Sequence, residues 1–373
     1  MLKHRLYSTC NPHIPSFIWP IEQILSFQNS KQPQKARRNS VSTKLRERKQ
    51  NIWYIHLQLH AIFMSTQQPI WFLLLSSLGF FIFLKHSISL ARWIFITFLR
   101  PAKDLKRSYG SWGLITGATD GIGKAFAYQL AKKGLNLVLV SRSSNKLESV
   151  SEEIRSHFPD VQIKTVAFDF SRDQGLVKLV EEEIKGLDVG VLINNVGVTY
   201  PAARYFHEVD EKMWVDIVRV NLEGTTKVTV AVVPGMLQRK RGAIVNIGSG
   251  AAVVVPSHPL YTIYAATKAY VDQLSRSLYM EYKQYGIDVQ IQVPLYVATK
   301  MVSKVASIEK SSLFIPSADA YAEAAVKRIG YEARCTPFWA HSLQWWFARL
   351  VPDSLLDAWR FNIGLNRRGK PAI

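Results

Sequence analysis

The sequence predicts an α/β protein with one doubly wound parallel sheet, preceded by a membrane anchor and followed by a helical extension. The sheet is predicted because, from Tyr109 onward, short apolar runs alternate with amphipathic stretches of about 10–15 residues, the pattern of right-handed βαβ units. The anchor is predicted by a run of large apolar residues at 70–84, which lies ahead of that alternation.

The expected strands are short, apolar and bounded by turn-forming residues, and the expected helices lie between them. The strands fall at 111–118, 135–143, 161–170, 189–197, 242–249 and 287–296. The helices fall at 122–134, 143–158, 172–187, near 209–236 and near 261–285. No internal repeat interrupts this order, so a single sheet accounts for the whole central region.

Length and composition limit the class of protein. The 373 residues allow one large domain with extensions, or two domains, and 48% hydrophobic residues suffice for a sizeable core. The two cysteines, Cys10 and Cys335, cannot form a disulfide framework or a metal cluster. The histidines show no HxxxH or HExxH spacing, so we expect no metal site and a folded part in a reducing compartment.

The formal charge of +19 does not indicate a nucleic-acid-binding protein. Residues 1–63 hold ten Lys and Arg against Glu22 and Glu47, and further basic residues flank the apolar run. Basic residues beside an apolar segment favour a membrane surface as the partner. No zinc-finger spacing or RNP motif is present, so we expect a lipid bilayer and no nucleic acid.

We divide the chain into a disordered basic leader at 1–63, an anchor at 64–107, a catalytic domain at 108–305 and a helical extension at 306–373. The leader is either a transit peptide or not part of the natural product; we favour the second interpretation, with translation beginning at Met64. The anchor is either a tilted span or a span followed by an interfacial helix. Its basic flank predicts that the following domain faces the cytosol.

The first βα turn is the glycine-rich stretch TGATDGIG at 116–123. A three-glycine pattern alone is weak evidence, and a tight packing turn is the alternative. Here Gly117, Gly121 and Gly123 follow a strand, precede a helix and open the first βαβ unit. Backbone amides and a helix N-terminus at this place suit a pyrophosphate, so the sequence predicts a Rossmann-type dinucleotide site.

The residues after the second expected strand bear on the choice of dinucleotide. An NAD enzyme usually offers an acidic residue there to the ribose 2′-hydroxyl, whereas this chain has Ser141-Arg142. A guanidinium can pair with a 2′-phosphate through two hydrogen bonds. An exposed arginine at a strand end is the alternative explanation, and we favour NADP(H).

With the glycine turn, the remaining motifs resemble the short-chain dehydrogenase/reductase family. They are Asp169 at the end of the third strand, Asn194-Asn195-Val196-Gly197, Asn221 in VNLEGT, Ser249 in NIGSGA, and Tyr264 with Lys268. The resemblance covers about 107–300. It implies a Rossmann-type domain in which Asp169 contacts the adenine and Asn195 the adenosine ribose region. Further implied cofactor contacts are Thr119, Ile122, Arg142, Gly197, Val297 and Thr299, together with the glycines, Tyr264 and Lys268.

Four residues carry the expected chemistry, which is reduction of a carbonyl. Tyr264 is the proton donor, and Lys268, four residues later, lies on the same helical face and is expected to lower the phenol pKa. Ser249 is expected to orient the substrate carbonyl. By the resemblance, Lys268 also binds the nicotinamide ribose, and Asn221 holds a proton-relaying water. We expect Tyr261 to form a pocket wall and Tyr270 to pack on the helix.

Within the family, the stretches SGAAVVVPSHPLYTIYAATKAYVDQ and QVPLYVATKM are similar to plant very-long-chain 3-oxoacyl-CoA reductases. This similarity implies an endoplasmic-reticulum enzyme that uses NADPH in the fatty-acid elongation cycle, beside other elongase-complex enzymes. A membrane-bound hydroxysteroid dehydrogenase shares every catalytic residue and stays an alternative, as does a non-catalytic NADP-sensing scaffold. Two departures are the fifteen-residue spacing from Ser249 to Tyr264, and Pro294-Leu295 in place of Pro-Gly.

The C-terminal tail, residues 336–365, is rich in tryptophan and poor in charge. Helices of this composition often lie at a bilayer interface. We expect the C-terminal tail to complete an acyl-chain tunnel next to the membrane. The alternative is that it only covers the core or a dimer partner.

Overall fold

The computed structural model describes residues 36–66, 70–172 and 175–368, and it divides at Ile88 into two compact units. In the first unit, α1 runs over Ala36–Thr66. The expected disorder is therefore wrong from Ala36 on, while residues 1–35 lie outside the described part. The segment lacks proline and glycine and is rich in Arg, Lys, Leu and Gln, so intrinsic helix propensity acts without any apolar period.

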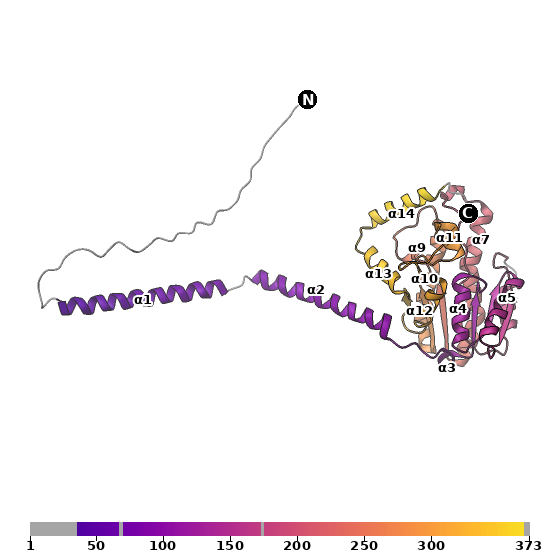
Figure 1. Cartoon of the computed structure of the whole chain (residues 1–373), viewed down its shortest axis with the longest axis horizontal. Coiled ribbons are helices and arrows are strands. Elements are labelled where there is room, and N and C mark those ends of the chain that lie inside the picture. The colour runs from indigo at the N-terminus through magenta and orange to yellow at the C-terminus, as the bar shows by residue number, and fades with distance from the viewer. Residues whose placement is uncertain (1–35, 67–69, 173–174, 369–373) are drawn as a thin grey trace, which may run out of the picture. The chain divides into compact units, whose positions relative to one another are not determined.

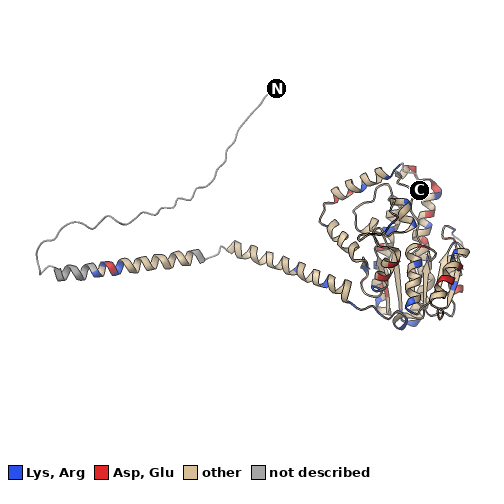
Figure 2. Cartoon of the chain, viewed as in Figure 1, with Lys and Arg blue, Asp and Glu red and all other residues tan. Residues whose placement is uncertain are grey.

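The apolar segment forms one continuous helical stretch, α2 (Ile70–Ile94) followed by the π-helical turn η1 (Phe95–Leu99). Within the described residues, Ile70–Leu99 is the one helix whose length and composition would let it cross a membrane, and none of its most apolar window is buried. Lys85 and Arg92 are the only charged residues between 70 and 99, and the ribbon of α2 is accordingly mostly tan in Figure 2.

The second unit, Ser89–Ile373, contains one seven-stranded sheet in the order β3-β2-β1-β4-β5-β6-β7. All paired strands are parallel, which confirms the predicted doubly wound architecture. The strands are β1 (Trp112–Thr116), β2 (Asn136–Ser141), β3 (Ile163–Ala167), β4 (Val189–Asn194), β5 (Gly242–Ile247), β6 (Ile287–Gln292) and β7 (Arg334–Cys335). The chain order reverses between β1 and β4, where ligands bind in such sheets.

Helices cover both faces of the sheet (Figure 1). One face packs against α4 (Gly121–Lys132), α5 (Ser144–His157) and α12 (Ala318–Val326). The other packs against α6 (Leu176–Ile184), α8 (Gly224–Arg239) and α10 (Thr262–Tyr282). The expected helix near 209–236 is divided, because α7 (Glu211–Val218) is followed by the π-helical turn η3 (Arg219–Glu223) before α8 begins.

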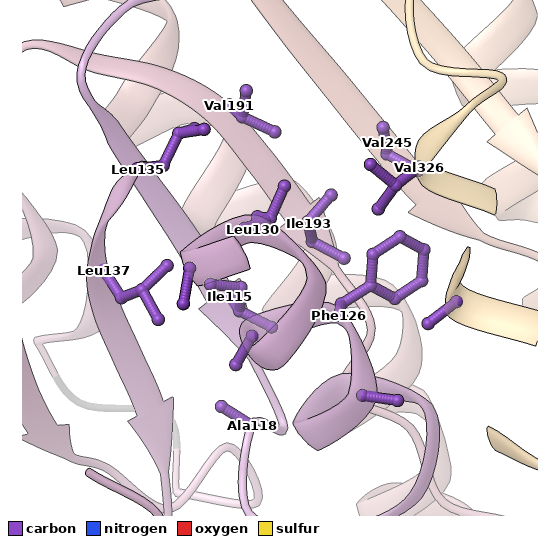
Figure 3. Close-up of a cluster of buried hydrophobic side chains, with 14 of the residues drawn as sticks. Ile115, Ala118, Phe126, Leu130, Leu135, Leu137, Val191, Ile193, Val245 and Val326 are labelled. Carbon is purple, nitrogen blue, oxygen red and sulfur yellow. The ribbon is translucent and has the colours of Figure 1, made fainter. Parts of the chain in front are cut away.

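Side chains alternate between two buried clusters along β1, β2, β4 and β5, as in parallel sheets that are covered on both faces. Leu114 faces one cluster, and its neighbour Ile115 faces the other. Figure 3 shows Ile115, Ile193 and Val245, from three adjacent strands, beside Phe126 of α4. Phe126 is completely buried, so it fixes α4, and with it the glycine turn, against the sheet.

Residues 306–373 belong to the same compact unit as the sheet, so no packing boundary falls at the expected division after residue 305. They supply α12 and β7 as well as α13 (Trp339–Ala348) and α14 (Asp353–Arg367). The sequence did not predict β7 because a two-residue strand carries no alternation. The remaining elements are α3 (Leu105–Tyr109), η2 (Phe206–Glu208), α9 (Gly250–Val253), η4 (Lys283–Tyr285) and α11 (Lys300–Ala306).

Phe126→Ala should lower the free energy of unfolding by about 3–5 kcal/mol, because it removes a fully buried ring and leaves a cavity. The measurement is denaturant unfolding of the purified protein followed by circular dichroism. Phe206→Ala is the control, since Phe206 is 68% exposed and its loss should cost less than about 0.5 kcal/mol. Equal effects of the two variants would contradict the position of α4.

Candidate active site

The expected site residues converge at the carboxyl ends of β1, β4 and β5. Gly117 and Gly121 have positive φ angles of 66° and 52°, a region that favours glycine. Asp120 caps α4 by accepting a hydrogen bond from the Gly121 amide at 2.8 Å. A cavity of about 350 Å³ opens beside this turn, and exposed amides at a helix start suit a phosphate group.

Gly123 allows the unusually close contact between α4 and β1. A Cβ atom at this position would lie 2.2 Å from the Gly117 carbonyl oxygen and 2.4 Å from Asn195 Nδ2. Asn195 ties the same turn to β4, because its Nδ2 donates to the carbonyl oxygens of Thr116 and Gly117 at 3.1 and 3.2 Å. The side-chain amide of Asn195 therefore holds the turn, and the residue also lines the cavity.

The cavity collects most of the predicted cofactor residues. Its lining includes Gly117, Thr119, Gly121, Ile122, Arg142, Asn195, Gly197, Ser249, Tyr264, Lys268, Val297 and Thr299. Three predicted residues lie outside the lining. Gly123 serves the packing just described, and Asp169 and Asn221 are held by hydrogen bonds elsewhere.

Arg142 lies at the β2 end of the cavity, beside Ser141, whose hydroxyl is 2.9 Å from that of Thr119. Asp169 lies close enough for the charge of Arg142 to act on it. Burial raises the pKa of Asp169, but hydrogen bonds from the amide and hydroxyl of Ser171 and the charges of Arg142 and Arg172 outweigh it, so the net pKa is lowered. Asp169 is thus a carboxylate anion that accepts hydrogen bonds from Ser171, two residues later in the same turn.

Tyr264 and Lys268 lie one turn apart on α10 and both line the cavity. Lys268 Nζ donates to the Ile247 carbonyl oxygen at 2.8 Å, and burial lowers its pKa to about 8. Burial raises the pKa of Tyr264, and a hydrogen bond with Ser249 acts in the opposite direction without outweighing it. The expected lowering of the phenol pKa by Lys268 is therefore not found in the protein alone, because desolvation dominates.

Asn221 lies in the π-helical turn η3 and fixes the loop after β4. Its Oδ1 accepts from the Val198 amide at 2.7 Å, and its Nδ2 donates to the Val198 carbonyl oxygen at 2.9 Å and to Thr267 Oγ1 at 3.0 Å. The side chain thereby connects the β4 loop to α10. A π-helical turn at this place is typical of functional sites, and the expected water-holding role stays a prediction.

A second cavity, of about 680 Å³, adjoins the first at Ser249 and Tyr264, which line both. Its walls are mostly apolar and come from α9, the loop after β6, α11, α13 and α14. Tyr261 is one of these walls, as expected; it is 3% exposed and stacks on Tyr200 with ring centroids 5.6 Å apart. Tyr270 packs on α8 through a 3.0 Å contact between its hydroxyl and that of Thr226.

The loop that has Pro294-Leu295 in place of Pro-Gly is held by His341 of α13. The Leu295 amide donates to His341 Nδ1 at 3.3 Å, and His341 Nε2 lies 3.1 Å from the Tyr296 carbonyl oxygen. This pairing requires a neutral imidazole with its proton on Nε2. Burial lowers the pKa of His341 to about 4, in agreement with the neutral form.

The family model described as short chain dehydrogenase matches residues 112–310. The chain belongs to this family. It is an oxidoreductase, and the resemblance inferred from the ordered motifs is confirmed. The matched range includes the glycine turn, Ser249, Tyr264 and Lys268, as well as every strand from β1 to β6.

The proteins that are similar to this chain include both named reductases and a protein that is named inactive. A very-long-chain 3-oxoacyl-CoA reductase-like protein of Arabidopsis thaliana is 61% identical over 305 residues, which are 82% of this chain and 97% of that protein. The very-long-chain 3-oxoacyl-CoA reductase of Mus musculus is 42% identical over 65% of this chain and 76% of its own length. The inactive hydroxysteroid dehydrogenase-like protein 1 of Homo sapiens is also 42% identical, over 75% and 83%.

Among solved structures, a short-chain dehydrogenase from Sphingobium yanoikuyae in complex with NADPH is 29% identical, with a TM-score of 0.55. The match covers 70% of this chain and 98% of that one. A 7beta-hydroxysteroid dehydrogenase has a TM-score of 0.62 at 23% identity, and this likeness concerns the fold alone.

Two residues at the site were not anticipated from the sequence. Tyr296 was recognised only as part of a loop motif, and His341 only as one histidine without metal spacing. Their partners are far away in the chain, since His341 holds a loop about 45 residues upstream. A buried histidine in an apolar helix gives no local signal of the loop that it contacts.

The contacts of neutral His341 with Leu295 and Tyr296 predict that the stability of the protein depends on pH. Because its pKa falls from the ordinary 6.5 to about 4 on folding, the unfolded chain binds more protons between these values. The stabilisation is complete above pH 6.5 and is lost as the pH falls toward 4. From pH 7 to 4.5 the free energy of unfolding should fall less in His341→Asn than in the wild type, by on the order of 2 kcal/mol.

The measurement is denaturant unfolding at several pH values. Ser342→Ala is the control; it removes a hydroxyl that accepts a 2.9 Å hydrogen bond from Trp93 Nε1 but no titratable group. This control should shift stability while keeping the wild-type pH slope. A His341→Asn slope equal to that of the wild type would show that the imidazole is not held neutral.

Proposed function

We propose that this short chain dehydrogenase reduces very-long-chain 3-oxoacyl-CoA to 3-hydroxyacyl-CoA with NADPH in the fatty-acid elongation cycle. The observation that carries the proposal is that Ser249 and Tyr264 line both cavities. A carbonyl that enters from the apolar cavity meets these two hydroxyls at the border of the dinucleotide cavity. The names of the plant and mouse relatives support the acyl-CoA as substrate.

The cofactor NADP(H) agrees with the family and with the NADPH-bound neighbour. The residues fit the group, because the glycine cradle leaves no room for a Cβ at Gly123 and borders the cavity through Gly117 and Gly121. Arg142, at the β2 end, would hold the 2′-phosphate, which a guanidinium binds through paired hydrogen bonds. When bound, the dihydronicotinamide supplies the hydride.

The protein's own residues bind the carbonyl and supply the proton. Ser249 would donate a hydrogen bond to the carbonyl oxygen and orient it. Tyr264 would donate its phenolic proton to that oxygen as negative charge develops, and its raised pKa keeps the proton on it beforehand. Lys268, anchored on the Ile247 carbonyl oxygen, would then stabilise the phenolate through its positive charge, which is needed only during the reaction.

The apolar cavity supports a long acyl chain as the other part of the substrate. The C-terminal tail contributes a large share of its wall, namely Gln344, Phe347, Ala348, Val351, Leu355, Leu356, Trp359 and Arg360. This composition agrees with the proposed acyl tunnel. An alkyl chain placed here would remove apolar surface from water, at about 0.8 kcal/mol for each buried methylene.

A bilayer beside this cavity would explain the exposed apolar residues of the C-terminal tail. Trp346, Phe347, Leu350, Leu355 and Trp359 are all at least half exposed. The Trp93 Nε1 hydrogen bond to Ser342 Oγ at 2.9 Å joins the end of α2 to α13. We therefore propose an anchor at Ile70–Leu99 in the endoplasmic-reticulum membrane, a catalytic unit that faces the cytosol, and neighbouring elongation enzymes as partners.

Tyr264→Phe should abolish reduction of a long-chain 3-oxoacyl-CoA, a loss of at least about a hundredfold, because the proton donor is removed. NADPH binding, measured by fluorescence, should persist because the ring remains. Tyr270→Phe is the matched control on the same helix; it contacts Thr226 outside the cavity and should retain activity. Full turnover by Tyr264→Phe would refute the assignment.

NADPH oxidation by membranes containing the protein, compared for a long-chain 3-oxoacyl-CoA and a 17-ketosteroid, tests the substrate. We expect turnover of the thioester alone. Turnover of the steroid alone would favour the hydroxysteroid dehydrogenase. No turnover of either substrate would favour a non-catalytic role. This outcome has to be considered because the similar human protein is named inactive.

Leu356→Trp should shorten the preferred acyl chain, because it fills the apolar cavity from α14. We expect kcat/KM for the longest 3-oxoacyl-CoA to fall about tenfold or more and that for a short-chain homologue to change little. Leu365→Trp, on the same helix but outside the lining, is the control. Equal losses for long and short chains would argue against an acyl tunnel.

A further inference from the structure

Besides Ser249 and Tyr264, the lining of the apolar cavity contains a polar cluster formed by Tyr296 with Arg360 and Arg367 of α14. Arg367 Nη1 donates to the Tyr296 hydroxyl at 2.9 Å, and Arg360 Nη1 donates to the same oxygen at 3.4 Å. All three residues line the cavity that contains Ser249 and Tyr264. The cluster is therefore built into the wall of the proposed substrate site.

The two arginines lack an acidic partner within the described residues. Arg360 is 8% exposed, and its Nε has no hydrogen-bond partner there. Arg360 Nη2 also lies 2.7 Å from Nε2 of the His258 ring. Burial lowers the pKa of His258 most strongly, and the charges of Arg360 and Arg367 lower it further, to about 3. A buried positive charge without a counterion is costly, so this arrangement favours electron-rich atoms brought by a ligand.

The Tyr296 hydroxyl has one hydrogen-bonding function left. A phenolic oxygen accepts through its lone pairs and donates one proton. Both guanidiniums donate to this oxygen, and among the described contacts no acceptor is assigned to its proton. Burial raises the pKa of Tyr296, but Arg360 and Arg367 outweigh it and lower the net pKa, which strengthens the hydroxyl as a donor.

The position of Tyr296 relative to Tyr264 indicates what the donor meets. The two phenols lie close enough for Tyr296 to act electrostatically on the pKa of Tyr264. Ser249 and Tyr264 would hold the 3-oxo oxygen under the proposed function. In a 3-oxoacyl thioester, the second carbonyl is separated from the first by a single methylene group, so its oxygen is the nearest further acceptor in the substrate.

We propose that Tyr296 determines specificity by donating a hydrogen bond to the thioester carbonyl oxygen of a 3-oxoacyl-CoA. This inference rests on the proposed function. Arg360 and Arg367 are positioning residues that fix the phenol and polarise its O–H bond. The arrangement selects 1,3-dicarbonyl substrates over isolated ketones, because a ligand without the second oxygen leaves the desolvated donor unpaired.

The test uses two matched ligands with the full-length membrane protein. One is a long-chain 3-oxoacyl-CoA, and the other is its thioether analogue, in which a methylene group replaces the thioester carbonyl. Tyr296→Phe should lower kcat/KM for the thioester about tenfold, the value of one hydrogen bond. It should change kcat/KM for the thioether, or its inhibition constant against the thioester, by less than about twofold.

Tyr261→Phe is the matched control, since Tyr261 is a second wall phenol whose hydroxyl is buried without a partner. It should leave the thioester preference unchanged. Arg367→Gln keeps a donor but removes the charge, so it should give a smaller loss that is again confined to the thioester. Fluorescence measurement of NADPH binding checks that every variant is folded.

Equal effects of Tyr296→Phe on both ligands, or none, would overturn the inference while leaving the proposed function intact. A selective loss in Tyr261→Phe instead would also overturn it, by assigning the donor to the other phenol. Absence of wild-type turnover with the thioester would be a failure of the proposed function. The wild-type rate therefore tests the function, and the ratio between variants tests the role of Tyr296.

Discussion

The close contact between α4 and β1 is the constraint on which the rest of the site depends. The Gly117 carbonyl oxygen lies only 2.2 Å from the place that a Cβ of residue 123 would take, and Asn195 Nδ2 donates to that same oxygen. The Asn195 side-chain amide thus joins the end of β4 to the turn after β1, and the absence of a side chain at Gly123 lets α4 approach the same turn. Because this contact brings the start of α4 to the carboxyl end of the sheet, Gly117, Thr119 and Gly121 of the turn line a cavity.

Further hydrogen bonds position the residues that are proposed to react. Ser249 lies two residues after β5 and caps α9, and Lys268 is fixed to the carbonyl oxygen of Ile247, the last residue of β5. Asn221 ties the β4 loop to α10. The hydroxyls of Ser249 and Tyr264 therefore lie at the common border of two cavities. The raised pKa of Tyr264 keeps the phenol protonated, which its proposed role as proton donor requires.

The local part of this arrangement could be predicted from the sequence, and the distant part could not. The glycine turn and the Tyr264–Lys268 pair depend on spacings of a few residues, which helix and turn geometry fix. Residues 36–66 were mispredicted because they consist of helix-forming residues without a repeating apolar pattern, so the sequence gives no sign of an amphipathic helix there. The packing of Gly123 against Gly117 was not predicted, because a glycine pattern does not show which glycine approaches which atom, and its contact with the cofactor stays a prediction.

The distant part consists of the contacts that α13 and α14 make with the loop after β6. These contacts are one reason for regarding the two helices as part of the site. His341 fixes the backbone of Leu295 and Tyr296 from α13. Arg360 and Arg367 fix the side chain of Tyr296 from α14. The same loop is thus held at its backbone and at its phenol by two helices that also form the apolar wall. Under the proposed function, a change in these helices would reach the loop beside Tyr264, so recognition of the acyl chain would be coupled to positioning of the carbonyl.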